Sequence, residues 1–214
     1  MTRYNAVIFD VDSTLSGIEG IDWLAALRGP EMQAWSSSLT ERAMKGELPI
    51  EAVYGERMKA VRPSAAEIEA LGRVYVERIA PGAQSTLAEL RQNGIQLVMV
   101  SGGLREAIIP LARELDVSER SLYAVSVFFD GNGEYAGFED TSLLTQQQGK
   151  RITVQAMDLK KPTLAVGDGM TDSEMKPAVT SFAAFTGFTR REPVLERADF
   201  VVNSFTELRD LILR

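Results

Sequence analysis

Two short acidic segments contain the side chains of this sequence that are best suited to chemistry. They are Phe9-Asp10-Val11-Asp12-Ser13-Thr14 and Gly167-Asp168-Gly169-Met170-Thr171-Asp172. Clustered carboxylates repel one another unless a cation lies between them, and Mg²⁺ prefers oxygen ligands. A carboxylate can also act as a nucleophile, and a second one nearby can transfer protons. We therefore expect the two segments to form one Mg²⁺ site.

Two further features could bind a phosphate group. Ser101-Gly102-Gly103 stands before a predicted helix, and helix N-termini bind phosphate through backbone N–H groups. Lys150 could neutralise a phosphate oxygen. Each feature also has a simpler explanation in isolation: Ser101 could be an N-cap and Lys150 an ordinary solvated lysine. In the same way, Asp10 and Asp12 could merely form Asx turns or cap a helix.

The amino-acid composition excludes several kinds of chemistry. The sequence has no His and no Cys, so it has no Ser-His-Asp triad, cysteine nucleophile, disulfide or zinc site of the usual kind. The 30 acidic and 23 basic residues give a net charge of −7, which argues against a nucleic-acid partner. No apolar run approaches the roughly 18 residues of a membrane helix, so we expect a cytoplasmic protein with no membrane partner. The oligomeric state is left open.

Short apolar runs alternate with amphipathic stretches, a pattern that favours a parallel sheet flanked by helices. The predicted strands are Val7–Phe9, Ile95–Val100, Thr163–Val166, Phe182–Phe185 and Phe200–Val202. Ligands of open parallel sheets bind at the carboxyl ends of the strands, where both acidic segments are expected to lie. We therefore predict a doubly wound α/β fold with its site at this edge of the sheet.

Two regions depart from the alternating pattern. Residues 16–80 show helical spacing, with Pro49 and Pro63 where helices should begin, and indicate a helical insertion. The predicted domains are thus a core formed by residues 1–15 and 81–214 and an inserted helical domain formed by residues 16–80. Strand residues around an Asn-Gly turn predict a hairpin over residues 125–138.

The reactive motifs occur in a recognisable order. They are Asp-x-Asp-x-Thr from Asp10, Ser-Gly-Gly from Ser101, Lys150, and Gly-Asp-Gly-x-x-Asp from Gly167. This set resembles the motifs of the haloacid dehalogenase-like superfamily of aspartate-nucleophile phosphotransferases. The resemblance extends to the phosphoserine phosphatase family through Glu19-Gly20-Ile21-Asp22, Arg42-Ala43-Met44, Glu56-Arg57 and Asn132-Gly133-Glu134-Tyr135-Ala136-Gly137-Phe138. It covers nearly the whole chain and implies a Rossmann-like core with residues 16–80 as a cap over the site.

The resemblance also implies roles for the acidic residues. Asp10 would be the nucleophile that forms an aspartyl-phosphate. Asp12 would protonate the leaving alcohol and then act as the base for the hydrolytic water. Mg²⁺ would be held by Asp10, the main-chain carbonyl of Asp12 and Asp168, with support from Asp172.

Substrate binding would fall to the strand ends and the cap. The implied phosphate-binding residues are Ser101, Gly102, Gly103, Lys150 and Thr171. In the cap, Arg57 would pair with a substrate carboxylate, Glu19 would accept an ammonium group, and Met44 would pack over the substrate. From spacing alone, Ser16 and Glu19 could instead form a capping box, and Arg57 could be an exposed helix arginine.

The implied activity is Mg²⁺-dependent hydrolysis of O-phospho-L-serine, a small-molecule phosphomonoester, to L-serine and phosphate in serine biosynthesis. One alternative is another small phosphomonoester, or transfer of the phosphoryl group to an alcohol. A second alternative is a non-enzymatic signalling module that is phosphorylated on Asp10. The helical insertion with Glu19 and Arg57 favours an enzyme, because a signalling receiver has no need to enclose a substrate.

Overall fold

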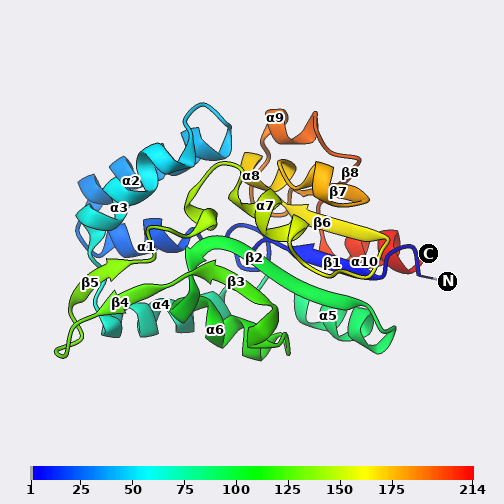
Figure 1. Ribbon diagram of the computed structural model, residues 1–214, viewed down its shortest axis with the longest axis horizontal. Coiled ribbons are helices and arrows are strands. Elements are labelled where there is room, and N and C mark those ends of the chain that lie inside the picture. Colours follow the sequence, from blue (N-terminus) through cyan, green and yellow to red (C-terminus); the bar gives the residue numbers. More distant parts are fainter. Residues whose placement is uncertain (1) are drawn as a thin grey trace.

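A computed structural model describes residues 2–214, and its centre is a six-stranded parallel sheet (Figure 1). In spatial order the strands are β3 (Leu122–Val125), β2 (Gln96–Leu104), β1 (Ala6–Phe9), β6 (Thr163–Gly167), β7 (Ser181–Phe185) and β8 (Phe200–Val202). All neighbouring strands run parallel. The direction of strand addition reverses between β1 and β6, and ligands of open α/β sheets bind at such switch points. The predicted doubly wound fold is confirmed.

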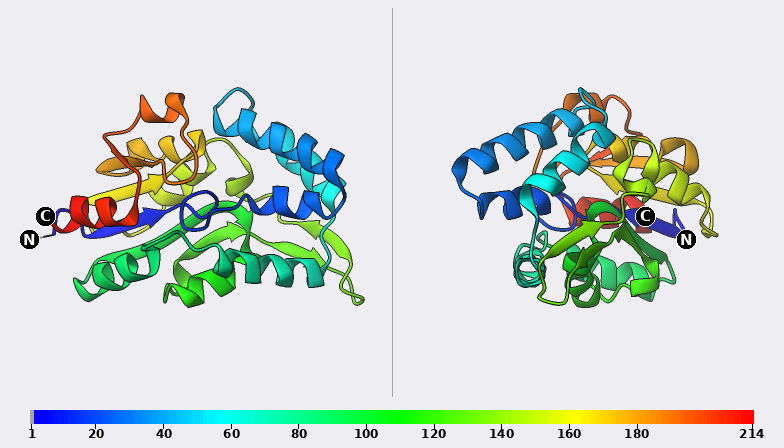
Figure 2. Two further views of the ribbon diagram at one scale, coloured as in Figure 1. Left: turned by 180° about the vertical axis from the view of Figure 1, so that it is seen from behind. Right: turned by 60° about the vertical axis from the view of Figure 1, so that its left-hand side comes forward.

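Helices cover both faces of this sheet (Figure 2). They are α5 (Ala83–Gln92), α6 (Arg105–Glu114), α7 (Gly149–Gln155), α8 (Met170–Ser173), α9 (Glu192–Leu195) and α10 (Phe205–Leu213), with the 3₁₀ turns η1 (Glu119–Ser121), η2 (Leu143–Thr145) and η3 (Lys176–Ala178). The central strand β1 is therefore buried on both sides, which explains its continuous apolar sequence. No helix within residues 2–214 is long and apolar enough to cross a membrane.

Four helices lie between β1 and α5, within the predicted insertion. They are α1 (Gly20–Ala26), α2 (Pro30–Met44), α3 (Ile50–Val61) and α4 (Ala65–Glu77), and we call them the cap helices. Local sequence sets where they begin: Pro30 is the first residue of α2, Pro49 precedes α3, and Ser64 forms a capping box with Glu67 in α4. Helix α4 packs against α6, and α2 and α3 lie beyond the carboxyl edge of the sheet (Figure 1).

The observed hairpin is shorter than the predicted one. Its strands are β4 (Val127–Phe129) and β5 (Tyr135–Phe138). Val125 belongs instead to β3 of the large sheet, because Leu122–Val125 pairs with β2. Ala65 N donates to Gly133 O at 2.8 Å, and the rings of Tyr54 and Phe138 lie 5.4 Å apart. The hairpin is therefore packed against the cap helices.

Strand β2 is longer than its apolar run predicts. It continues from Val100 through Ser101-Gly102-Gly103 to Leu104, and α6 begins at Arg105 without a side-chain cap. The pairing of β2 with β3 shifts register between Val100 and Leu104, which is the signature of a bulge. The interpretation of Ser101 as a helix N-cap is therefore wrong.

Candidate active site

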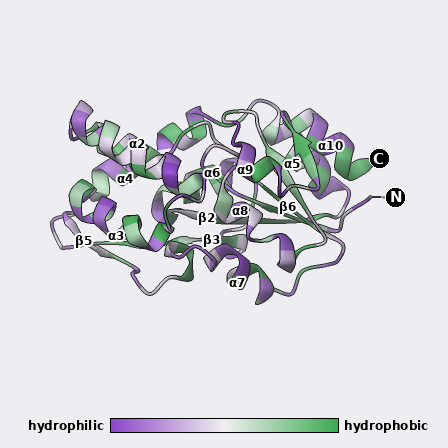
Figure 3. Ribbon diagram, turned by 90° about the horizontal axis from the view of Figure 1, so that it is seen from above, coloured by the Kyte–Doolittle hydropathy of each residue, from purple (hydrophilic) through white to green (hydrophobic). Residues whose placement is uncertain are grey.

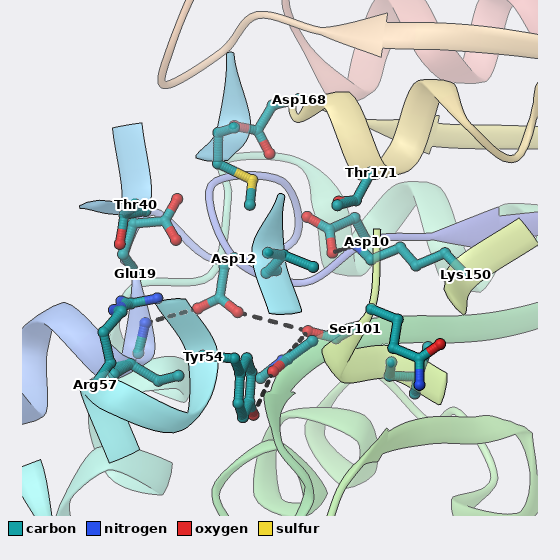
Figure 4. Close-up of a pocket in the computed structure, with 18 residues that line it drawn as sticks. Asp10, Asp12, Glu19, Thr40, Tyr54, Arg57, Ser101, Lys150, Asp168 and Thr171 are labelled. Atoms are coloured by element: carbon teal, nitrogen blue, oxygen red, sulfur yellow. Dashed lines mark hydrogen bonds and ion pairs between the residues drawn. The ribbon is translucent and has the colours of Figure 1, made fainter. Parts of the chain in front are cut away.

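The predicted site residues converge on one pocket between the carboxyl ends of β1, β2 and β6 and the cap helices (Figure 4). Those that line it are Asp10, Asp12, Glu19, Met44, Arg57, Ser101, Gly102, Gly103, Lys150, Asp168 and Thr171. Asp172 is buried next to Lys150. The parallel sheet thus brings together residues that lie far apart in the sequence.

Three carboxylates form a compact buried cluster. One oxygen from each of Asp10, Asp168 and Asp172 lies within 4.8 Å of the others. Burial, reinforced by repulsion from Asp172, raises the pKa of Asp10 well above its ordinary value. Burial, only partly offset by Arg191, raises the pKa of Asp168 to about 6. Three buried carboxylates this close together offer the oxygen donors that a divalent cation prefers, so the cluster fits such an ion.

Lys150 projects from α7 into this cluster. Its Nζ lies 2.5 Å from Asp10 Oδ1 and 2.7 Å from Asp172 Oδ1, and the side chain is buried. Burial alone would lower the pKa of Lys150, but the two carboxylates outweigh that effect and raise it. The ammonium group is therefore held charged beside Asp10. The interpretation of Lys150 as an ordinary solvated lysine is wrong.

The carboxylate of Asp12 lies apart from the cluster, toward the cap helices. Its Oδ1 accepts hydrogen bonds from Gly20 N and from the phenol of Tyr75, both at 2.7 Å. Its Oδ2 faces Ser101 Oγ at 3.5 Å (Figure 4). Burial raises the pKa of Asp12, and the two donors to Oδ1 lower it in part. A carboxyl group in this environment is suited to carrying a proton.

Glu19 is the N-cap residue of α1, but its side chain lines the pocket and makes no capping hydrogen bond. Ser13 Oγ donates to its Oε1 at 2.8 Å. Ser16 Oγ instead donates to the backbone carbonyls of Tyr75 and Arg78, and α1 begins only at Gly20, so the capping-box interpretation is wrong. Burial raises the pKa of Glu19 well above its ordinary value. A cationic ligand group would relieve this unfavourable environment.

Arg57 of α3 is buried at 6% exposure, which contradicts the interpretation as an exposed helix arginine. Its Nη2 lies 2.7 Å from Asp22 Oδ1, and its Nε donates to Ser36 Oγ at 3.1 Å. Asp22 Oδ1 also accepts hydrogen bonds from Ser36 Oγ at 2.5 Å and Thr40 Oγ1 at 2.9 Å. These contacts fix one edge of the guanidinium, while Arg57 also lines the pocket.

The remaining predicted residues form the walls of the pocket. Gly103 N donates to Ser101 Oγ at 2.9 Å, which fixes that hydroxyl at the end of β2. Met44 of α2 covers the loop after β6 so closely that a Cβ on Gly169 would lie 2.6 Å from its sulfur. Thr171 in α8 is buried at the pocket wall.

Several residues of the site carry no signal in the sequence. Arg191 is buried, and its Nη1 donates to Asp168 Oδ2, which also accepts from Thr189 Oγ1 at 2.9 Å. Its Nη2 lies 3.2 Å from Glu41 Oε2 on α2. Tyr75 and Arg191 reach the site only through the packing of distant segments, and no local motif marks them.

A Rossmann-like core with carboxylates and a buried lysine at its switch point defines a class of α/β enzymes that transfer phosphoryl groups. The family model for haloacid dehalogenase-like hydrolases matches residues 4–177. Human phosphoserine phosphatase is 33% identical over 207 residues, which span 95% of this chain and 91% of the human protein. The chloroplastic phosphoserine phosphatase of Arabidopsis thaliana is 34% identical over 210 residues, which span 95% of this chain and 70% of the plant protein.

Solved structures show the same fold. A phospho-aspartyl intermediate analogue of phosphoserine phosphatase superposes with a TM-score of 0.84 at 25% identity, covering 97% of this chain and 98% of that one. A phosphoserine phosphohydrolase-like protein from Francisella tularensis has a TM-score of 0.88 at 22% identity, covering 98% and 100%. The chain belongs to the haloacid dehalogenase-like hydrolase family and, within it, to the phosphoserine phosphatase family.

Proposed function

We propose that this enzyme hydrolyses O-phospho-L-serine to L-serine and phosphate through an aspartyl-phosphate on Asp10. One observation carries the proposal: a carboxylate paired with a buried lysine faces the same pocket as Glu19 and Arg57. The first pair suits phosphoryl transfer, and the second matches the ammonium and carboxylate of an amino acid.

The reaction would have two steps. An Asp10 oxygen attacks phosphorus, the bond to the serine oxygen breaks, and Asp12 gives its proton to that oxygen. Asp12 then takes a proton from water as the water oxygen attacks the phosphorus of the aspartyl-phosphate, which restores the Asp10 carboxylate and releases phosphate. Lys150 neutralises charge on the phosphoryl oxygens, together with N–H and hydroxyl groups of Ser101, Gly102, Gly103 and Thr171.

We further propose Mg²⁺ as the divalent cation. Asp10, Asp168 and the main-chain carbonyl of Asp12 would hold it. Asp172, which lies in the same carboxylate cluster and contacts Lys150, would support these ligands. The short distances within the carboxylate cluster and the raised pKa values of Asp10 and Asp168 support a cation there. When bound, Mg²⁺ would supply electrostatic stabilisation of the phosphoryl group.

Residues 16–80 would act as a cap domain that selects the substrate. Glu19 would accept the substrate ammonium, Arg57 would bind the carboxylate, and Met44 would exclude water above the reacting groups. This proposal is supported by the position of Arg57, which lines the pocket while Asp22 fixes one edge of its guanidinium. It is also supported by the raised pKa of Glu19, because a buried carboxylate needs a positively charged partner once water is excluded.

Phosphate release from a panel of phosphomonoesters, with and without Mg²⁺, tests this function. The panel should contain both enantiomers of phosphoserine, phosphothreonine and a sugar phosphate, with an added alcohol to detect transfer. We expect O-phospho-L-serine to have the highest kcat/KM. A higher kcat/KM for a substrate without an amino-acid group would identify a different phosphomonoesterase.

A further inference from the structure

One oxygen of the Asp12 carboxyl group, Oδ1, is held by two donors from the cap helices. Gly20 N at the start of α1 and the Tyr75 phenol of α4 both donate to the same oxygen, Oδ1, at 2.7 Å. Tyr75 is fully buried. Two short hydrogen bonds on one oxygen fix the plane of the carboxyl group as well as its position.

The packing around Tyr75 directs its hydroxyl group to Asp12 Oδ1. A Cβ on Gly20 would lie only 2.1 Å from that hydroxyl oxygen, so the phenol reaches Asp12 because residue 20 has no side chain. In addition, Ser16 Oγ donates to the backbone carbonyl of Tyr75 at 3.0 Å and to that of Arg78 at 3.2 Å. The last turn of α4 is thereby anchored to the segment that follows Asp12.

The second oxygen of Asp12 has a different environment. Oδ2 lies close to Gly103, where a Cβ would approach it to 2.8 Å, and it accepts one long hydrogen bond, from Ser101 Oγ at 3.5 Å. Both residues line the pocket. Because Oδ1 already accepts two hydrogen bonds, a proton on this carboxyl group is better placed on Oδ2.

We propose that Tyr75 is a positioning residue that fixes Asp12 with Oδ2 toward the substrate, so that this oxygen delivers and later receives the catalytic proton. The inference rests on the acid–base role proposed above for Asp12. As the bond between phosphorus and the serine oxygen breaks, the proton moves from Oδ2 to that oxygen. The charge left on the carboxylate is stabilised at Oδ1 by Tyr75 and Gly20 N. Because both donors to Oδ1 belong to the cap helices, the alignment of the general acid depends on how these helices pack on the core.

The test is the rate of enzyme phosphorylation in Tyr75→Phe, measured by rapid quench with substrates that differ in their need for protonation. With O-phospho-L-serine we expect the rate to fall about 10-fold to 100-fold, since one hydrogen bond to a charged group is lost. With 4-nitrophenyl phosphate, whose leaving group departs as a stable anion, we expect a loss of less than about 3-fold. Tyr4→Phe, at another buried tyrosine outside the pocket, is the matched control and should match the wild type on both substrates.

A second variant tests the same contact without removing the phenol. Gly20→Ala should push the Tyr75 hydroxyl away from Asp12 and reproduce the selective loss on phosphoserine, and thermal unfolding of each variant shows whether it is folded. Equal losses on both substrates, or no loss in either variant, would overturn the inference and leave Tyr75 as a packing residue.

Asp12→Asn separates this inference from the proposed function. Full turnover of phosphoserine by Asp12→Asn would refute the acid–base role itself. A large selective loss in Asp12→Asn together with wild-type rates in Tyr75→Phe would refute only the role of Tyr75.

Discussion

The carboxylate of Asp10 is subject to two opposing electrostatic effects. Burial and the neighbouring Asp172 raise its pKa, whereas the Lys150 ammonium at 2.5 Å lowers it. In the proposed mechanism only the ionised form of Asp10 can attack phosphorus, so Lys150 would favour the nucleophile before it binds the phosphate. The contacts of Lys150 with Asp10 and Asp172 explain why this lysine of α7 is buried among carboxylates.

Asp10→Asn should remove turnover while the fold survives. The amide has nearly the same size and can still accept a hydrogen bond from Lys150, but it is a poor nucleophile and a weaker cation ligand. We expect kcat for phosphoserine to fall by at least about 10³-fold. Mass spectrometry after rapid quench should detect a phosphorylated wild-type enzyme and no phosphorylated variant. Near-normal turnover by the folded variant would exclude Asp10 as the nucleophile.

The buried pair of Arg57 and Asp22 leads to a prediction about recognition of the substrate carboxylate. Arg57→Ala should lower kcat/KM for phosphoserine by about 10² or more, the effect of truncating one member of a buried charge pair. Phosphoethanolamine is the matched substrate because it differs from phosphoserine only in lacking the carboxylate, and its kcat/KM should fall less than about tenfold. Asp22→Asn should show the same selectivity with a smaller loss, since Arg57 keeps its charge. Equal losses on the two substrates would mean that Arg57 supports the cap or the phosphate site in general.

At the scale of elements, the strands whose apolar runs are separated from other strands were predicted from the sequence. Strand β3, which is separated from β4 by one residue, was missed. Leu122–Val125 is followed after one residue by β4, so the two strands look like one hairpin arm in the sequence. Their separation depends on pairing with β2, which no local pattern records. Asp10 and Asp168 were predictable because each directly follows a buried strand. Tyr75 was not, because it lies 63 residues from its partner Asp12.

Arg191 joins two elements that the sequence gives no reason to connect. It contacts Asp168 after β6 and Glu41 on α2, so it links the carboxylate cluster to the cap helices. The pair with Asp168 has both side chains 3% exposed, whereas Glu41 is 46% exposed. Breaking a buried pair leaves an uncompensated charge, and breaking an exposed pair costs little.

The two contacts of Arg191 should therefore differ in their contribution to stability. In the absence of a divalent cation, Arg191→Gln should lower the free energy of unfolding by about 3–5 kcal/mol, and Glu41→Gln by less than about 1 kcal/mol. Mg²⁺ should reduce the deficit of Arg191→Gln, because a cation at Asp168 replaces part of the lost positive charge. Urea unfolding with and without Mg²⁺ measures both effects. A deficit that is equal in the two variants, or unchanged by Mg²⁺, would contradict this account.

On the scale of the whole molecule, three cap helices each contact residues at or near the carboxyl edge of the sheet. Tyr75 reaches Asp12, Glu41 reaches Arg191, and the Tyr54 phenol donates to the carbonyl of Gly102 at 2.8 Å. Figure 3 views the assembled molecule from above, with cap helices at one end and the chain termini at the other. The sequence predicted a helical insertion over residues 16–80 from its spacing, but these contacts depend on how the two parts pack.

The carboxylate cluster makes the stability of the entire fold dependent on cation and pH. For Asp168 the ordinary pKa is 3.8, and burial raises it to about 6 in the folded chain. Between these values the folded state binds more protons than the unfolded state, so the free energy of unfolding of the cation-free protein should fall as pH rises through this window. A divalent cation that binds only the folded state should reverse that loss.

Thermal unfolding with and without Mg²⁺ at a series of pH values tests this linkage. One Mg²⁺ concentration is used throughout, about 100 times the dissociation constant at pH 7, where binding should add about 2.7 kcal/mol to the free energy of unfolding. The gain should be larger above pH 6 than at pH 4, because protonated carboxylates bind the cation poorly.

EDTA should abolish turnover of phosphoserine, and Mg²⁺ should restore it. Asp168→Asn is the matched variant and should lose most of the stabilisation by Mg²⁺, whereas Asp199→Asn, a carboxylate paired with Lys176 outside the pocket, should keep it. Full turnover in exhaustively chelated protein, or an equal gain in both variants, would show that the cluster does not hold the catalytic cation.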